Sequence, residues 1–316
     1  MTPRYGNGSM SNPARRVMIL VAAGSAAIVA LAGCSDVPQG VDGDLTDDWG
    51  GFSEPVGFAP DPLTCHDQPY RQAASLADYQ PVECEQPHLV ETVHVGAFTG
   101  EAAELAAPPA ATSAEHRQAY RECEEHAADH LGAGFRLGRL WLGVSVPSEA
   151  GWQGGARWFR CELVEIESIY GDPVRRQGSL AGSLASDAPA DLRLGCYQVT
   201  AEDGAVSEMN PVGCDAPHDA EFVGTWRGPA GGYPDPSDSD DEREVYQGCR
   251  ERVAAYVDVP VDGDLVYRTG TIADWMSESE WQAGDRAFRC YLWLPGRELT
   301  ESLAGAGTDA LPVQTE

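Results

Sequence analysis

Apolar residues recur along this chain with two different periods, and each period appears twice. Segment 84–98, CEQPHLVETVHVGAF, turns at its proline and then follows a β-rich pattern through Val90, Val93 and Val95. Segment 220–226, AEFVGTW, repeats this pattern. We therefore predict that each segment is a strand that begins just after a turn.

A helical spacing follows each of these strands. Apolar residues share one helix face at Tyr120, Cys123, Ala127 and Leu131 in the first case, and at Val245, Tyr246, Cys249, Val253 and Tyr256 in the second. Thr112 and Glu115 make a candidate capping box where the first helix begins. Strand-like segments 138–146 and 264–272 come next, and a closing strand ends each unit. The pattern predicts an α+β fold in which a small antiparallel sheet with one packed helix is used twice.

The two halves are copies of one unit. Cys65, Cys84, Cys123 and Cys161 correspond to Cys196, Cys214, Cys249 and Cys290, with offsets between 126 and 131 residues. The sequence Cys-x-x-Pro-His-x-x-Glu occurs at 84–91 and at 214–221, and we call it the Pro-His-Glu motif. Segments Trp-Gln-x-Gly-x-Arg and Ser-Leu-Ala-Gly also recur in the same order. A duplication with two long copies predicts two tandem domains.

The first 34 residues resemble an export signal. Two arginines precede the apolar run 17–33, and Cys34 follows it. The ending Leu-Ala-Gly-Cys is similar to the lipobox of bacterial lipoproteins, in which the cysteine is lipidated. The run would also serve as a short transmembrane helix, and Ala30-Leu31-Ala32 as an ordinary cleavage site. The cysteine count favours lipidation of Cys34, because the other eight cysteines form two matching sets of four.

These observations divide the chain into five parts. They are a lipoprotein signal peptide (1–33), an acidic flexible tether (34–62), a first module (63–182), a second module (183–305) and a tail (306–316). The stretch 171–194 is expected to join the modules. About 26 flexible residues of the tether would give a root-mean-square reach of roughly 30 Å.

Export would place the remaining cysteines in an oxidising compartment, so we expect four disulfides and two disulfide-braced modules. The third cysteine of each set lies on the predicted helix and the other three lie in or beside strands, which favours a bridge from helix to sheet. Four cysteines allow three connectivities, and the sequence does not choose among them.

The charge of the chain excludes one class of partner. Fifty acidic residues face 21 basic ones, for a formal net charge of −29. Without the leader and its three arginines, 18 basic residues face the same 50 acids, and the charge becomes −32. Such a chain repels nucleic acid and anionic lipid headgroups, so we expect no nucleic-acid partner.

The repeated histidines and glutamates are candidate binding residues. In a functional interpretation, Glu91 orients His88, and Glu221 orients His218, for proton transfer or ligand binding. In a structural interpretation, the proline fixes a turn beside a disulfide, and the two side chains satisfy backbone groups or pair with an arginine, Arg157 or Arg286. We favour the structural interpretation and expect no catalytic residue, because the sequence contains neither G-x-S-x-G nor S-x-x-K.

Two other patterns contain residue types that could bind a metal ion. His126 and His130 lie four apart on the first helix, but Ala127 stands where a metalloprotease has its general base, so we expect solvated helix surface, no metal and no cofactor. The acidic loop 235–244 lacks the spacing of a calcium loop and is expected to stay solvated.

The tryptophan segments are the remaining candidates. Trp152 with Arg157, and Trp281 with Arg286, would offer an aromatic ring and a guanidinium to a glycan or a peptide. A buried tryptophan that covers the end of the core, followed by a turn and a strand, is the simpler interpretation, and we favour it.

The lipobox, the acidic tether and the two copies of C…C-x-x-P-H-x-x-E…C…W-x-x-G-x-R-x-x-x-C resemble the septum-formation domain family of actinobacterial exported proteins and lipoproteins. The resemblance covers residues 63–294. It implies a cell-envelope protein associated with septum formation, and it supplies no catalytic residues. The copies differ at one position of the pattern, with Gly155 in the first and Asp285 in the second.

We therefore expect a non-enzymatic protein anchored by lipid on the extracellular face of the cytoplasmic membrane. Its two modules would bind an envelope or division protein, or peptidoglycan. The alternative is an envelope hydrolase or metal-dependent amidase that acts on peptidoglycan and uses His88 or His218. A third interpretation, a small ligand held between the modules, requires a cleft shared by both.

Overall fold

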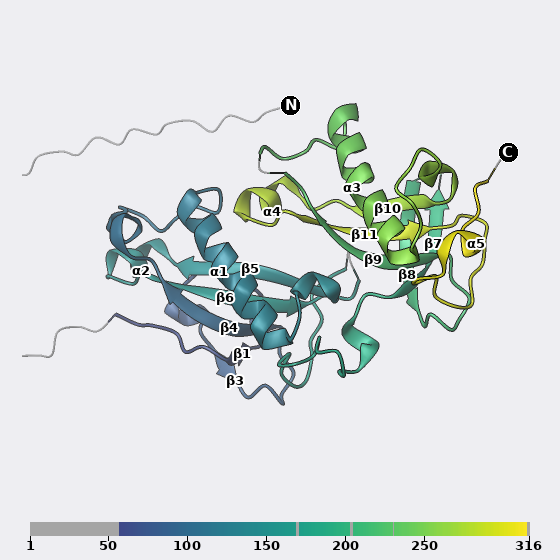
Figure 1. Cartoon of the computed structure of the whole chain (residues 1–316). Helices are drawn as coiled ribbons and strands as arrows, with labels where there is room; N and C mark the ends of the chain where they lie inside the picture. Colours follow the sequence, from purple (N-terminus) through teal and green to yellow (C-terminus); the bar gives the residue numbers. More distant parts are fainter. Residues whose placement is uncertain (1–56, 169–170, 203–204, 230, 315–316) are drawn as a thin grey trace, which may run out of the picture. The chain divides into compact units, whose positions relative to one another are not determined.

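The computed structural model describes residues 57–168, 171–202, 205–229 and 231–314, which form two mixed α/β modules (Figure 1). The predictions for the signal peptide, for Cys34 and for most of the tether concern residues outside this part of the chain. In each module one long helix lies across one face of a sheet (Figure 1). The predicted α+β class and the sheet-plus-helix unit are confirmed.

The first module contains a six-stranded sheet in the order β2-β5-β6-β4-β1-β3, antiparallel except for the short β2–β5 pair. Its strands are β1 (Thr64–His66), β2 (Ala73–Ala74), β3 (Pro81–Val82), β4 (Val90–Ala97), β5 (Leu140–Pro147) and β6 (Trp158–Glu165). Its helices are α1 (Ala114–Leu131) and α2 (Glu149–Gln153), with short 3-10 turns at Leu76–Asp78, Gly100–Glu104 and Phe135–Leu137.

The second module contains a five-stranded antiparallel sheet in the order β10-β11-β9-β7-β8. Its strands are β7 (Cys196–Glu202), β8 (Ala205–Val212), β9 (Ala220–Arg227), β10 (Gly270–Asp274) and β11 (Ala287–Trp293). Its helices are α3 (Ser239–Val257), α4 (Glu278–Ala283) and α5 (Gly307–Ala310), with a 3-10 turn at Leu265–Tyr267. A further 3-10 turn, Ala190–Leu192, precedes β7 and packs with the first core.

The predicted helix faces are the buried ones. The α1 face of Tyr120, Cys123, Ala127 and Leu131 is at most 3 % exposed and packs on the first sheet. Helix α3 buries Val245, Cys249 and Val253, while Tyr246 and Tyr256 are half-buried. Burial of these faces against the sheet stabilises the helix in each module.

The helix starts differ from the prediction. The cap of α1 is Ser113, whose Oγ accepts a hydrogen bond from the His116 N–H, so the predicted box at Thr112 is wrong by one residue. Asp238 caps α3 by accepting from the backbone N–H groups of Asp240 and Asp241. Much of the acidic loop therefore serves as the first turn of α3, where carboxylates favour the positive end of the helix dipole.

The disulfides join the first cysteine to the second and the third to the fourth in each module. The pairs are Cys65–Cys84, Cys123–Cys161, Cys196–Cys214 and Cys249–Cys290. The predicted bridge from helix to sheet is therefore confirmed, since it ties α1 to β6 and α3 to β11. The other bridge ties the start of each sheet to the turn of the Pro-His-Glu motif.

Three predicted segments turn out differently. The expected strand 264–272 begins with the 3-10 turn Leu265–Tyr267, and only β10 is a strand. Short helices α2 and α4 replace the turn expected between the last two strands. The hairpin of β7 and β8 was not predicted, because its exposed β8 lacks an apolar period.

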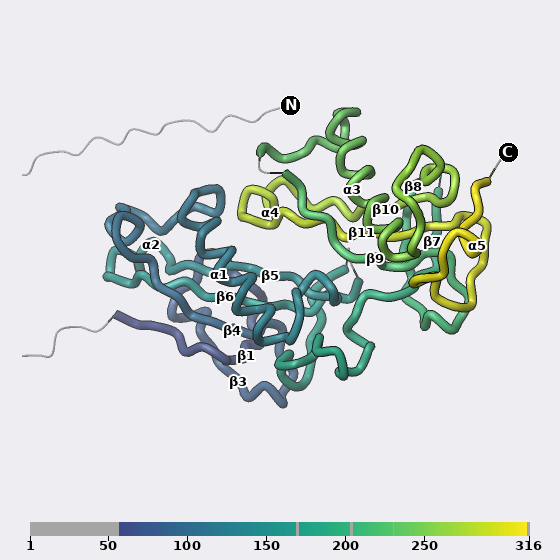
Figure 2. Tube along the Cα trace, in the orientation of Figure 1, coloured from purple at the N-terminus to yellow at the C-terminus, as the bar shows by residue number. Residues whose placement is uncertain are grey.

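The predicted linker and tail are parts of the modules. Leu180, Leu184 and Leu192, from the stretch expected to join the modules, pack in the first core (Figure 2 traces its path). Leu311, from the expected tail, is fully buried in the second module, and the Arg268 guanidinium donates to its carbonyl. The apolar residues of these two segments follow neither a helical nor a strand period. The sequence therefore gave no sign that the predicted linker and tail would pack in the cores.

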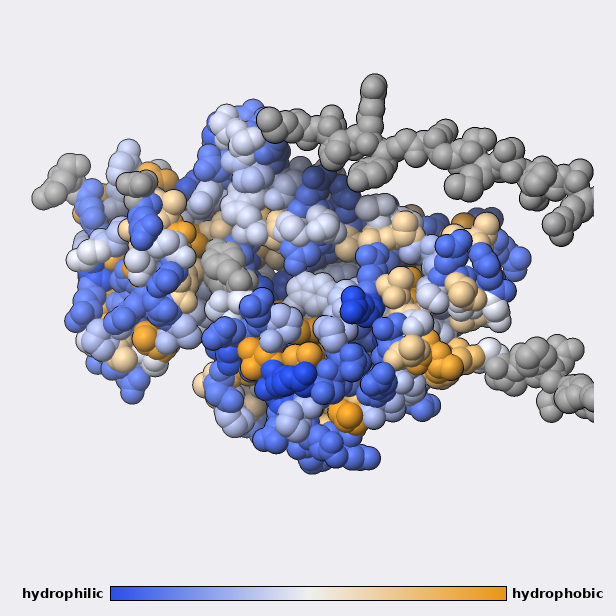
Figure 3. Space-filling view, turned by 180° about the vertical axis from the view of Figure 1, so that it is seen from behind, coloured by the Kyte–Doolittle hydropathy of each residue, from blue (hydrophilic) through white to orange (hydrophobic). Residues whose placement is uncertain are grey.

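The surface of the described residues is largely polar. Hydrophilic residues cover most of the face seen in Figure 3, in keeping with the excess of acidic side chains. No helix in the described ranges has the length and apolarity that a bilayer crossing requires.

Removal of the helix-to-sheet disulfides should destabilise the modules strongly. Replacing Cys123 and Cys161 together by alanine opens a loop of 38 residues, and the chain-entropy model gives a loss of about 4 kcal/mol of unfolding free energy. The pair Cys65 and Cys84 closes 19 residues and should cost about 3 kcal/mol. Denaturant titration of the paired variants measures both values, and a loss below 1 kcal/mol at Cys123–Cys161 would contradict a bracing role.

Candidate functional site

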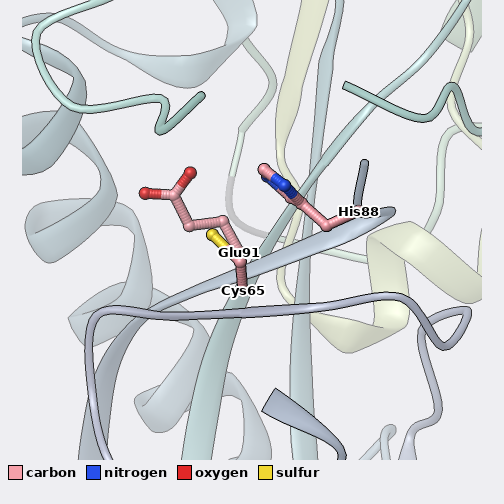
Figure 4. A group of neighbouring side chains, drawn as sticks. All are labelled: Cys65, His88 and Glu91. Carbon is pink, nitrogen blue, oxygen red and sulfur yellow. The ribbon is translucent and has the colours of Figure 1, made fainter. Parts of the chain in front are cut away.

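The Pro-His-Glu motif lies where the first strand of each module meets the next long strand. Cys65 pairs with Glu91 across β1 and β4, and Cys196 pairs with Glu221 across β7 and β9. Figure 4 shows Cys65, His88 and Glu91 grouped above one strand. The motif therefore brings a disulfide, an imidazole and a carboxylate together inside each module.

The Glu91 carboxylate joins three separate parts of the first module. It accepts hydrogen bonds from His130 Nε2 at 2.6 Å, from Ser179 Oγ at 2.6 Å and from the Leu180 N–H at 2.7 Å. Glu91 is 2 % exposed, yet its oxygens are well supplied with donors. The buried charge is therefore stabilised rather than left uncompensated.

The Glu221 carboxylate joins the corresponding three parts of the second module, with a tyrosine in place of the histidine as the donor from the helix. It accepts from Tyr256 Oη at 2.7 Å, from Ser302 Oγ at 2.9 Å and from the Leu303 N–H at 2.9 Å. His130 and Tyr256 both stand seven residues after the helix cysteine. The recurrence of Ser-Leu-Ala-Gly is thereby explained, because its serine hydroxyl and leucine N–H bind the glutamate.

These contacts correct two predictions. His130 is not solvated helix surface, since its side chain is 13 % exposed and bound to Glu91. The glutamates do not pair with Arg157 and Arg286. The sequence contained the signal for the true partner, the recurring Ser-Leu-Ala-Gly segment, but gave no reason to place it beside the motif 88 residues earlier.

His88 and His218 are held by the turns that precede them. His88 Nδ1 donates to the Gln86 carbonyl at 2.8 Å, and His218 Nδ1 donates to the Ala216 carbonyl at the same distance. Their backbones pair with Arg176 and Leu299. His218 Nε2 lies 3.3 Å from Glu221 Oε1, whereas His88 Nε2 has no hydrogen-bond partner in the described ranges. Both rings are almost completely buried, at 0 % and 1 % exposed.

The tryptophan segments are buried in both modules. Trp152 and Trp281 are each 1 % exposed, so neither ring offers a face to a glycan or peptide in this structure. Arg157 and Arg286 lie over them, with the guanidinium carbon 4.1 and 4.2 Å from the ring centre. Each arginine also donates to a loop carbonyl, that of Ala103 or Gly231. Each arginine therefore holds a loop against the buried tryptophan of its module.

Burial and hydrogen bonding act on Glu91 in opposite directions. Burial, the largest single influence, raises the pKa of its carboxyl. Hydrogen bonds from His130, Ser179 and the Leu180 N–H together outweigh burial, so the pKa lies below its ordinary value. The folded protein therefore favours the ionised carboxylate.

Arg136 links the two modules through a buried ion pair. Its Nε donates to Asp285 Oδ1 at 2.9 Å and its Nη1 to Glu124 Oε1 at 2.6 Å, with Asp285 belonging to the second module. Burial lowers the pKa of Arg136, but the nearby carboxylates and Tyr120 raise the pKa by more than burial lowers it. The guanidinium therefore stays charged. The difference between Gly155 and Asp285 in the repeat now has a cause, since only Asp285 has this partner.

A cavity of about 160 Å³ lies beside this ion pair and is lined from both modules, by Tyr70, His116, Tyr120, Trp141, Glu280 and Ala283 among others. A small ligand held between the modules would have to occupy this cavity. Binding of such a ligand stays a prediction.

The structure places three groups of potential metal ligands together among the described residues. Two consist of the motif histidine and glutamate with Cys65 or Cys196, whose sulfurs are already in disulfides. The third unites His94, Glu122 and His126 in the first module. The sequence comparison of the copies missed this third group, because the second copy lacks it.

Replacing Glu91 by glutamine should destabilise the protein by about 1–3 kcal/mol. The glutamine side chain has one NH2 group in place of a carboxylate oxygen, so at least one of the donors that bind Glu91 loses its acceptor. The folded pKa of Glu91 is depressed, so its contribution is complete above the unfolded value near 4.5 and is lost as the pH falls through the folded value. The difference between wild type and Glu91→Gln should shrink below pH 4.5. Denaturant titrations at several pH values measure it.

The exposed Glu83 of the same module supplies the control, since Glu83→Gln should change stability by less than about 0.5 kcal/mol at every pH. A Glu91→Gln variant as stable as this control at pH 7 would show that the carboxylate does not hold the loop and helix.

The ion pair between the modules should show strong coupling. A double-mutant cycle with Arg136→Met and Asp285→Asn is expected to give a coupling energy of about 1–3 kcal/mol, because both side chains are mostly buried. The exposed pair Arg243 and Asp240 on α3 provides a matched cycle, which should give less than about 1 kcal/mol. Equal coupling in the two cycles would argue against the buried link.

Comparison with known proteins places this architecture in a family. A family model described as septum formation matches residues 64–290, which is more than half of the chain. The match begins at β1 and ends in β11 and so includes both Pro-His-Glu motifs. No curated protein and no solved structure matches the chain. The chain belongs to the septum-formation family.

Proposed function

We propose that this protein is anchored by lipid at Cys34 to the cell envelope and that its two modules are non-catalytic binding units in septum formation. Family membership supports the link to the septum. One observation carries the non-catalytic part: in both modules the motif histidine and glutamate are used to hold the module's own turn, helix and loop.

The burial of the motif argues against acid–base catalysis. A general acid or base must come within hydrogen-bond reach of the proton that it transfers, directly or through one water. His88 and His218 are 0 % and 1 % exposed, so a polymer such as peptidoglycan does not reach either ring in this structure. An envelope hydrolase would need these rings to open to solvent.

The anchor rests on cysteine use. The eight cysteines of the modules pair with one another in four disulfides, so none of them serves as a partner for the ninth, Cys34. Its place at the end of an apolar run suits lipidation. The tether would place the first module at a root-mean-square distance of roughly 30 Å from the membrane.

The charge of the protein limits the partner. An excess of acidic residues disfavours polyanions, so a protein or a neutral cell-wall segment is the better fit. Recognition would then depend on surface residues of the modules, because the repeated motifs are internal.

One double variant separates this proposal from the hydrolase alternative. Replacing both His88 and His218 by glutamine should lower the melting temperature, since each change removes a partly buried hydrogen bond that contributes about 0.5–1.5 kcal/mol. Any defect in septum formation in cells should then follow the amount of folded protein. A fully stable double variant that abolishes septum function would favour the hydrolase.

The control for location is Cys34→Ala, which should release the protein from the membrane fraction without changing its melting temperature. Crosslinking in intact cells should recover the anchored protein with a septal component, and the released variant should lose this contact. Retention of Cys34→Ala in the membrane fraction would count against the lipid anchor.

A further inference from the structure

We propose that the first module binds a divalent transition-metal ion of the zinc class through His94, Glu122 and His126, which β4 and α1 bring together at the edge of the core. The proposal goes beyond the role in septum formation and does not depend on it.

The three side chains already lie at near-ligand distances. His94 Nε2 is 3.0 Å from Glu122 Oε1, and the rings of His94 and His126 stack with their centres 3.6 Å apart. One ligand atom from each residue lies within 4.8 Å of the others. A tetrahedral zinc ion with bonds of about 2.0–2.1 Å holds its ligand atoms roughly 3.3 Å apart. The first pair fits as it stands. The rings of His94 and His126 are parallel to within 9°, so His126 has to rotate about its side-chain bonds to direct a ring nitrogen at the same ion.

An irregularity of β4 is what aims His94 at the helix. Side chains alternate along a regular strand, so neighbours Val93 and His94 should point to opposite faces. The register of β4 against β6 shifts between Thr92 and His94. Val93 packs in the helix-side core, and His94 stands opposite Cys161, which is bonded to the helix. Both neighbours therefore face α1, as bulges near functional sites allow.

The fold does not require these three residues. The second module builds the same helix and sheet with Gly224 opposite its last cysteine, Gly248 before its helix cysteine and Arg252 three residues after it. These are the positions of His94, Glu122 and His126. Scaffolding explains what both copies share, so it does not explain a cluster that only one copy has.

The donor set selects the metal. Two imidazoles and one carboxylate suit Zn²⁺ and its neighbours Cu²⁺, Ni²⁺ and Co²⁺, whereas Ca²⁺ and Mg²⁺ prefer oxygen ligands alone. Three protein ligands leave at least one position for water or another ligand. Access is open, because the side chains of His94 and Glu122 are 23 % and 42 % exposed. The acidic surface attracts cations toward the site.

Titration of the purified, disulfide-bonded protein with Zn²⁺ tests the proposal, with a chromogenic chelator as competitor and millimolar Mg²⁺ present to cover acidic surface groups. We expect one tightly bound ion per chain. His94→Gln, Glu122→Gln and His126→Gln should each weaken binding at least about tenfold, since even outer-shell changes cost 10–100-fold. Co²⁺ in place of Zn²⁺ should give the intense visible bands of four- or five-coordinate cobalt.

The second module supplies controls for folding and for charge. His126→Arg copies the residue that the second module carries, so the variant should keep the melting temperature of the metal-free protein while losing zinc. Glu251→Gln removes an exposed carboxylate from α3 and should leave affinity unchanged. Absence of saturable binding, equal affinity in all ligand variants, or an equal loss with Glu251→Gln would overturn the proposal.

Discussion

A buried carboxylate in each module determines how the rest of that module is arranged. Glu91 and Glu221 each gather a helix side chain, a serine hydroxyl and a leucine N–H from segments far apart in the sequence. A buried charge is tolerated only when its hydrogen bonds are complete, so loss of one donor affects the other contacts. The loop with Leu180 or Leu303 stays in the core because its N–H is held there.

The disulfides and the carboxylate restrain different parts of the same unit. One disulfide fixes the helix to the sheet, the other fixes the turn before the motif, and the glutamate fixes the returning loop. Together they leave the copies free to differ elsewhere. Even the helix residue that donates to the glutamate differs between the copies. It is the imidazole of His130 in the first module and the phenol of Tyr256 in the second.

The sequence predicted what depends on local spacing and on repetition. The face of Tyr120, Cys123, Ala127 and Leu131, the bridge from helix to sheet and the sheet-plus-helix unit could all be read from it. The partners of Glu91 could not, because they lie 39 to 89 residues away and depend on how a loop returns. The cluster around His94 was hidden for a similar reason: a strand irregularity that no side-chain pattern announces brings it to the helix.

The duplication also bears on where the proposed binding partner would make contact. The residues that both modules share are buried and make their contacts within their own module. They are the motif histidines and glutamates and the tryptophans that an arginine covers. A partner can contact only what reaches the surface, and there the copies differ: the partly exposed His94 and Glu122 stand where the second copy has Gly224 and Gly248. Two copies of one scaffold therefore present two different surfaces, so each module is expected to contribute its own contacts rather than to bind the same partner twice.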